Sequence, residues 1–231
     1  MTVIDLLDRP AYGMSQIDRI LLLPPGTARR WIEGYRRAGR DYPPVIRAES
    51  TGVEIATWGE FVETRLLAGY RDRGVPLLRM RPAIQRLREE FGTRYPLAYS
   101  QPFTAGRDLV RAVQEDVGLE RSLQFVVVRS GQQLLDLTAP ADEFYRTTEF
   151  SESDGSACLI RPLAYVPEVR IDPLRGYGEP VVRSVPTEVI AEQIRAGDNP
   201  EHVAELFEIS RIEVIAALRY ELSRRESTNA A

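Results

Sequence analysis

The stretch of the chain best suited to contact a charged partner is "GTARRWIEGYRRAG", residues 26–39. Arginine donates two parallel hydrogen bonds to guanine and pairs equally well with phosphate. Threonine and tyrosine hydroxyls also bond to the nucleic-acid backbone. Arg47, a little further on, is placed to reach a phosphate as well. We therefore predict a DNA-binding set made of Thr27, Arg29, Arg30, Tyr35, Arg36, Arg37 and Arg47.

The alternative is that these arginines form an ordinary solvated helix face. All thirty basic residues of this 231-residue chain are arginine, so arginine by itself is weak evidence. Its distribution is more informative: residues 1–99 hold sixteen arginines against twelve acids, and the remainder holds fourteen against twenty-two. The net charge of −4 thus combines a basic front with an acidic rear. This asymmetry favours DNA binding at the front and a different partner at the rear.

Several classes of chemistry find no support in the residue types. The single cysteine, Cys158, and the single histidine, His202, provide neither a disulfide nor a zinc site. They also form no nucleophile–base pair in a known motif, and the chain has no glycine-rich phosphate loop. We therefore expect no catalytic residues, no metal and no cofactor. With no apolar run long enough for a bilayer and an acidic N-terminus, we expect a cytoplasmic protein with no membrane contact.

The front of the chain is predicted to alternate short helices with one hairpin. "LPPG" separates two helices because prolines lack a donor and glycine permits a turn. We expect Thr27 to cap the second helix and Gly39 to end it, with Trp31 and Ile32 in the core. The expected elements are helices at 15–22 and 28–37, strands of a hairpin at 45–48 and 53–57, and helices from Trp58 or Glu60 to Arg73 and from Met80 to Phe91.

The rest of the chain is predicted to be mixed and then helical. Between 105 and 165 the expected elements are a helix or strand pair at 106–118, a hairpin turning at Ser130–Gly131, a helix at 139–147 and a buried strand at 157–165. Two extended runs then flank a glycine-rich turn within 168–184. Three helices follow, begun by Thr187, by Asn199–Pro200 and by Ser210.

Two segments resemble known families. Residues 12–99, with "YGMSQIDRILLLPPGTARRWIEGYRR" and "GVPLLRMRPAIQRLREEFG", are similar to the winged helix-turn-helix of MerR-like regulators. The long dimerisation helix usual in that family is absent. The C-terminal segment resembles a small domain of antitoxins that partner PIN-domain ribonucleases, although "GYGE" at 176–179 lacks the family's basic residue. The match is carried by Gly178, Pro180, Val181, Val182, Arg183, Thr187, Ile190, Gly197, Glu201, Val203, Ala204, Val214, Ala216, Ala217, Leu218 and Tyr220.

Together these segments make the chain similar to a VapB-type antitoxin of a type II toxin–antitoxin system. The resemblance implies a mainly α fold with small β elements (α+β): a winged helix-turn-helix at 1–99, a mixed α/β region at 100–165 and a trihelical domain at 166–231. It implies a homodimer that represses its own operon at operator DNA and neutralises a PIN-domain ribonuclease toxin. The predicted toxin-binding residues are Arg219, Arg224 and Arg225, for which a solvated tail is the alternative.

Two other interpretations stay open at this point. The chain is alternatively a stand-alone MerR-like transcriptional regulator whose region 100–165 senses a ligand. A catalytic protein of unknown chemistry is the third. A toxin gene beside this one would favour the antitoxin, and a small-molecule pocket in the middle region would favour the regulator.

Overall fold

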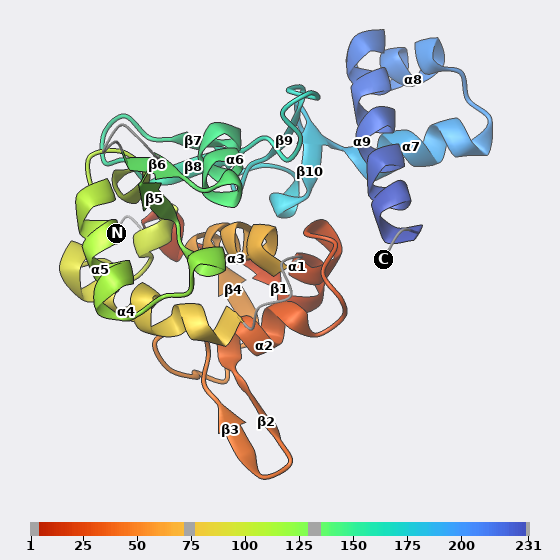
Figure 1. Ribbon diagram of the computed structural model, residues 1–231. Helices are drawn as coiled ribbons and strands as arrows, with labels where there is room; N and C mark the ends of the chain where they lie inside the picture. Colours follow the sequence, from red (N-terminus) through yellow and green to blue (C-terminus); the bar gives the residue numbers. More distant parts are fainter. Residues whose placement is uncertain (1–4, 72–76, 129–134, 230–231) are drawn as a thin grey trace. The chain divides into compact units, whose positions relative to one another are not determined.

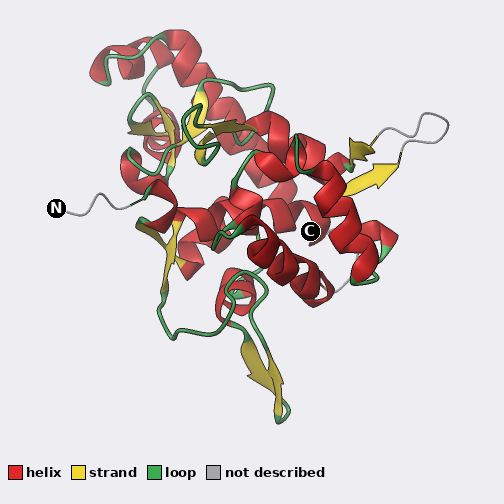
Figure 2. Ribbon diagram, turned by 90° about the vertical axis from the view of Figure 1, so that its left-hand side faces the viewer, coloured by secondary structure: helices red, strands yellow, loops and turns green. Residues whose placement is uncertain are grey.

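The computed structural model describes residues 5–71, 77–128 and 135–229, apart from the side chains beyond Arg224 (Figures 1 and 2). Helices and antiparallel strands alternate along the chain, so the fold is α+β. The chain divides into two compact units: residues 1–146 with 150–157, and residues 147–149 with 158–231. Among the described residues, no helix combines the length and the apolar character that crossing a bilayer requires.

The front of the first unit consists of short elements around one long helix. Strand β1 pairs antiparallel with β4. Helices α1 and α2, which come between these two strands in the sequence, pack against each other. The elements are β1 (Pro10–Gly13), α1 (Met14–Ile20), α2 (Thr27–Glu33), β2 (Tyr35–Arg37), β3 (Arg40–Tyr42), β4 (Ile55–Thr57) and α3 (Trp58–Arg71). Three aromatic rings form the centre of this core: Tyr12 stacks on Phe61 at 4.3 Å, and Trp58 lies 5.5 Å from Phe61.

The predicted helix at 28–37 is wrong in its second half. Helix α2 ends at Glu33 because Gly34 adopts φ +76°, and a Cβ at Gly34 would lie 2.5 Å from the carbonyl oxygen of Tyr42. The chain then forms the hairpin β2–β3, which turns at Ala38 and Gly39, both with positive φ. This hairpin projects from the first unit (Figure 1).

The hairpin predicted at 45–48 and 53–57 is also wrong. The N–H groups of Val45 and Ile46 donate to the carbonyl of Trp31 at 2.7 and 2.9 Å, so this segment caps the end of α2 instead of forming a strand. Strand β4 does form, but its partner is β1. Ile32 is buried as predicted, whereas Trp31 is only half-buried.

The remainder of the first unit is mostly helical. The predicted helices near 58–73 and 80–91 are confirmed as α3 and α4, although residues 72–76 lie outside the described part. Residues 107–116 form a helix, which decides between the two alternatives for that segment. The predicted turn at Ser130–Gly131 lies outside the described residues, but the strands on either side of it pair as expected. The elements are α4 (Arg81–Phe91), α5 (Arg107–Asp116), β5 (Val126–Val128), β6 (Leu135–Leu137) and α6 (Ala139–Thr147).

The second unit places three helices beside a five-stranded sheet of order β11-β10-β9-β8-β7. Its core is apolar, with Val169 and Val182 from the sheet meeting Ile190, Val203 and Val214 from the helices. The strands are β7 (Thr148–Phe150), β8 (Ala157–Ile160), β9 (Val169–Ile171), β10 (Pro180–Val182) and β11 (Val185–Pro186). The helices are α7 (Thr187–Ala196), α8 (Pro200–Leu206) and α9 (Arg211–Asn229).

The helix boundaries predicted for this unit are confirmed by their caps. Helix α7 ends at Gly197, which has φ +110°. The Asn199 side chain accepts from the N–H of His202 at 2.8 Å. Ser210 and Glu213 form a reciprocal capping box at the start of α9: Glu213 accepts from the Ser210 N–H at 2.7 Å, and the Ser210 hydroxyl accepts from the Glu213 N–H at 3.3 Å.

Candidate nucleic-acid interface and a charged cleft

The start of α2 is held in place by a buried carboxylate from α1. Asp18 accepts hydrogen bonds from the N–H groups of Gly26, at 2.6 Å, and Ala28, at 2.7 Å. Gly26 has φ +76°, the left-handed conformation that leads the turn into the helix. Because the first N–H groups of a helix lack intrahelical partners and carry partial positive charge, Asp18 both satisfies and stabilises this end. Asp18 thereby fixes the position of the start of α2 and so the orientation of its exposed face.

That exposed face carries two of the predicted arginines. Arg29 binds Glu54 with its Nη2 atom 2.9 Å from Oε1, and this hydrogen bond lowers the pKa of Glu54 below its ordinary value. Arg30 donates from Nη2 to the hydroxyl of Thr27 at 2.9 Å. Thr27 itself is buried and is the first residue of α2, with Gly26 as the cap. The predicted DNA contact of Thr27 is therefore corrected: its hydroxyl is used inside the protein.

The hairpin β2–β3 carries the other predicted residues of this set. Tyr35 lies opposite Tyr42, and their rings stack at 4.6 Å with planes 4° apart. Arg36 lies opposite Asp41 with a separation of 3.5 Å between Nε and Oδ1, both side chains being exposed. An exposed pair of this kind contributes little to stability. The stacking of Tyr35 on Tyr42, more than this ion pair, therefore holds the two strands together at the base of the hairpin.

Near the tip of the hairpin, two arginines face each other. Arg37 on β2 is the direct cross-strand partner of Arg40 on β3, and both are exposed. Neither makes an ion pair with another described residue. Like charges directly opposite on two strands are destabilising, so this arrangement favours a bound anion. Arg40 is absent from the sequence-based set; the near-symmetry of "YRRAGRDY" about Ala38–Gly39 is the signal that could have found it.

Arg47 does not belong to this surface, which corrects its predicted phosphate contact. Its side chain is 5% exposed and binds the buried carboxylate of Glu60 through two hydrogen bonds of 2.7 and 3.0 Å. It also pairs with Glu33 and donates to the carbonyls of Val53 and Ile55. Arg47 thus ties the segment before β4 to α2 and α3 and has a structural role.

A second buried acid lies on α3. Glu63 is fully buried, accepts from the N–H of Leu97 at 3.0 Å and lies 3.8 Å from a nitrogen of Arg88. Its Oε2 atom has no hydrogen-bond partner. Burial raises the pKa of Glu63 to about 7, because the nearby Arg88 only partly compensates for the lost hydration.

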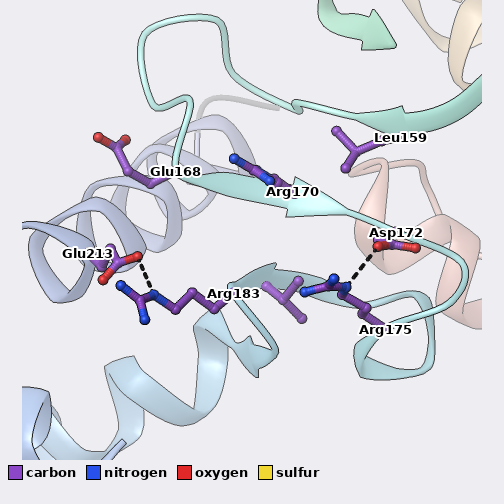
Figure 3. A pocket seen from close by; sticks show the side chains of 8 residues that line it. Leu159, Glu168, Arg170, Asp172, Arg175, Arg183 and Glu213 are labelled. Carbon is purple, nitrogen blue, oxygen red and sulfur yellow. Dashed lines mark hydrogen bonds and ion pairs between the residues drawn. The ribbon is translucent and has the colours of Figure 1, made fainter. Parts of the chain in front are cut away.

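The second unit contains a cleft of about 450 Å³ on the side of the sheet that carries Arg170 (Figure 3). Arg170 projects from β9 and lies opposite Val181 of β10. Arg183 donates from Nε to Glu213 at 2.8 Å, and the Nε of Arg175 lies 3.3 Å from Asp172. Arg170 makes no ion pair with another described residue. The cleft is lined by Leu159, Glu168, Arg170, Asp172, Arg175, Val181, Arg183 and Glu213.

One residue at the rim of this cleft, Arg183, has an unfavourable backbone conformation. Arg183 has φ +55° in the turn between β10 and β11, a conformation that most side chains avoid. Burial alone would raise the pKa of Glu213, but hydrogen bonds from Ser210 and Arg183 outweigh it and lower that pKa. Glu213 is therefore ionised at neutral pH and holds the side chain of Arg183 at the rim of the cleft.

The predicted toxin-binding arginines of α9 are not equivalent. Arg219 is exposed and lines a smaller cavity of about 200 Å³. Arg224 is half-buried; it donates to the Tyr220 hydroxyl at 3.0 Å and lies over that ring at 5.4 Å. The side chain of Arg225 lies outside the described part. The structure does not gather these three into one site. The cleft arginines were missed because they come from a strand, a loop and a turn that precede the three helices in sequence.

The molecule is thus a two-unit α+β protein with a basic hairpin in one unit and a mixed-charge cleft in the other. The chain is 39% identical over 227 residues to "Uncharacterized protein Rv2308" of Mycobacterium tuberculosis, covering 95% of this chain and 93% of the relative. The chain belongs to the same family as that protein. No protein-family model matches the chain.

Two further relatives come from the same organism. One, named "Putative antitoxin VapB45", is 27% identical over 215 residues and covers 86% of this chain and 88% of its own length. The other is the crystal structure of Rv2018, with a TM-score of 0.72 and 25% identity, covering 93% of this chain and all of that chain. Both likenesses extend over both units, and the first of them supports an antitoxin-like relationship.

Proposed function

We propose that the protein is an antitoxin without catalytic activity of its own. Its first unit binds operator DNA and represses its own operon, and its second unit binds and neutralises a PIN-domain ribonuclease toxin. The observation that carries the proposal is the exposed, directly opposed pair Arg37 and Arg40 on a projecting hairpin. The antitoxin name borne by a relative that matches most of the chain supports the toxin-binding half.

The DNA-binding half follows from the order and exposure of the elements. Two short helices joined by a turn, with a hairpin directly after the second, have the arrangement of a winged helix-turn-helix. Helix α2 has only seven residues, so it offers few contacts of its own beyond Arg29 and Arg30. The hairpin adds Arg36, Arg37 and Arg40. Because phosphate contacts dominate affinity for DNA, the hairpin is proposed to contribute a large share of the binding free energy.

This half is tested by binding to the DNA upstream of the protein's own gene. The double variant Arg37→Ala, Arg40→Ala should weaken binding and lower the slope of log K against log salt by about 2, since each phosphate contact contributes about 0.9. Arg111→Ala is the matched control, because Arg111 is an arginine of the same unit that pairs with Glu115 on α5 and has a side chain 40% exposed. Wild-type protein that does not shift this DNA, or a double variant that binds as the wild type does, would contradict the proposal.

The toxin-binding half is assigned to the cleft around Arg170. Its lining has three arginines and three carboxylates, so a free phosphate ion would gain little net attraction. A protein segment with its own carboxylate can pair with Arg170, which has no partner within the described chain. Complementary charges of this kind give specificity as well as affinity. We therefore propose that Arg170, with Arg175 and Arg183 beside it, receives an acidic side chain of the toxin.

The test is co-purification with the product of the adjacent gene, followed by an assay of that product's ribonuclease activity. Wild-type protein should bind it and inhibit it, and Arg170→Glu should lose both effects. Arg195→Glu is the matched control, because Arg195 is also an exposed arginine of the second unit, on α7. DNA binding without any association with that product would instead favour the stand-alone regulator.

A further inference from the structure

The outer face of α9 carries apolar side chains that nothing in the described chain covers. Ile212 is 69% exposed and Leu222 is 58% exposed, and Ile215 between them is half-buried. With Arg219 these residues follow a spacing of three, four and three, which places all four on one side of the helix. The same spacing forms the contact seam of paired helices. This α9 stripe (Ile212, Ile215, Arg219 and Leu222) therefore has the pattern of an interface.

The stripe continues into the smaller cavity of the second unit. Tyr165, which is 68% exposed, lines that cavity together with Ile212. Glu168 and Arg219 line it too, and neither makes an ion pair with a described residue. The surface therefore combines exposed apolar groups with one unpaired acid and one unpaired base. Exposed apolar side chains gathered in this way mark a site of protein association.

We infer that a second copy of this chain covers this surface in a two-fold symmetric dimer. A two-fold interface uses the same patch on both subunits, so the patch must be complementary to itself. This patch meets that condition: Glu168 can pair with the partner's Arg219 while Arg219 pairs with the partner's Glu168, and the apolar groups meet between them. A strongly acidic or strongly basic partner would match only one of the two charges.

This inference does not depend on toxin binding, but it bears on the DNA half of the proposed function. A two-fold dimer carries two copies of the β2–β3 hairpin. Two-fold symmetric DNA-binding proteins recognise two half-sites related by the same symmetry. Loss of the dimer should therefore weaken binding to a palindromic operator more than binding to a single half-site.

The first experiment measures the mass of the full-length protein by sedimentation equilibrium over a concentration series. The wild type should have twice the mass of the chain, and Ile212→Glu should raise the dimer dissociation constant at least about 30-fold, as expected for a central interface residue. Because Ile212 is exposed, the variant should keep the circular dichroism spectrum of the wild type. Leu206→Glu is the matched control: Leu206 is 53% exposed on α8, outside the patch, and its replacement should leave the dimer intact.

The second experiment exchanges the charges. Glu168→Arg and Arg219→Glu should each weaken the dimer, and the double variant should restore it, because the reciprocal pairs form again with opposite polarity. A monomeric wild type, or a dimer that Ile212→Glu leaves unchanged, would overturn the inference. So would loss of binding to the adjacent gene's product with no change in mass, because that result would assign the patch to the toxin.

Discussion

The interiors of the two units are built from different side chains. Among the described residues, the first unit buries five charged side chains: Asp18, Glu33, Arg47, Glu60 and Glu63. The buried side chains of the second unit are almost all apolar, and its described part buries no charged residue. Yet the second unit holds its charges at a cleft, where Arg183 and Glu213 meet at the surface.

Among the described residues, only the first unit therefore uses an arginine inside its core. In the first unit Arg47 is a connector, which satisfies two buried carboxylates and two carbonyls. In the second unit Arg170 faces outward with no partner in the described chain. A buried ion pair is directional and is costly to break, whereas apolar burial depends on area and tolerates small changes. The first unit should therefore be the more sensitive to single charge changes.

Arg47→Ala should produce the largest effect. It removes the cation beside the buried Glu33 and leaves Glu60 with the more distant Arg94, whose Nη2 lies 3.5 Å from Oε1, so the free energy of unfolding should fall by about 3–5 kcal/mol. Urea unfolding followed by tryptophan fluorescence measures this, because both tryptophans, Trp31 and Trp58, lie in the first unit. Arg86→Ala, at an exposed arginine of α4, is the control and should have little effect. An equally small effect at Arg47 would refute the connector role.

Glu63→Gln should stabilise the first unit, and only at higher pH. Because burial raises the pKa of Glu63 from 4.5 to about 7, the unfolded chain loses this proton while the folded chain still holds it. Wild-type stability therefore falls as pH rises from about 4.5 to 7. Glutamine does not titrate, so the variant should gain up to about 3 kcal/mol at pH 8 and almost nothing at pH 4. If the stability of the two proteins changed with pH in the same way, the pKa of Glu63 would not be raised.

Ile190→Val should test the apolar core of the second unit. Ile190 is fully buried, so removing one methylene should cost about 1 kcal/mol. Far-UV circular dichroism during unfolding follows the loss of the second unit's helices. Ile55→Val makes the same change at an exposed position of β4 and should cost nothing measurable. If the loss of unfolding free energy caused by Ile190→Val changed with pH, that result would contradict a purely apolar core.

Glu54→Gln should have the smallest effect on stability. Its partner Arg29 and Glu54 itself are exposed, so salt and water screen their attraction. The variant should unfold at the same urea concentration as the wild type. It should, however, bind DNA more tightly, because Arg29 is released from its internal partner and a repulsive carboxylate is removed. Unchanged DNA affinity would place Arg29 away from the interface.

The helix boundaries of the second unit could be predicted because their signals are local. Asn199, Ser210 and Gly197 act on backbone groups within a few residues, and they cap the helices as expected. The hairpin β2–β3 could not be predicted in this way. Arginine and tyrosine suit helices and strands alike, and what ends α2 at Gly34 is the close approach of Tyr42, eight residues later.

The candidate sites also differ in whether local sequence or distant contacts determine them. Arg29, Arg30, Arg36 and Arg37 are exposed, and their contacts with DNA stay a prediction; Arg36 and Arg37 lie on a hairpin strand instead of the predicted helix. Arg47 was misassigned because its partner Glu60 lies thirteen residues away and the pairing is visible only in the fold. The cleft gathers Arg170, Arg183 and Glu213 from separate elements, so no motif announces it.

By itself, the sequence determined the basic front, the acidic rear and the starts and ends of the C-terminal helices, because charge is additive along the chain and caps act over one turn. Only the tertiary structure decided which arginines are buried as connectors and which remain open to a partner. The reason is that solvation and ion pairing depend on neighbours in space: Arg37 and Arg40 keep their water, while Arg47 exchanges it for Glu33 and Glu60.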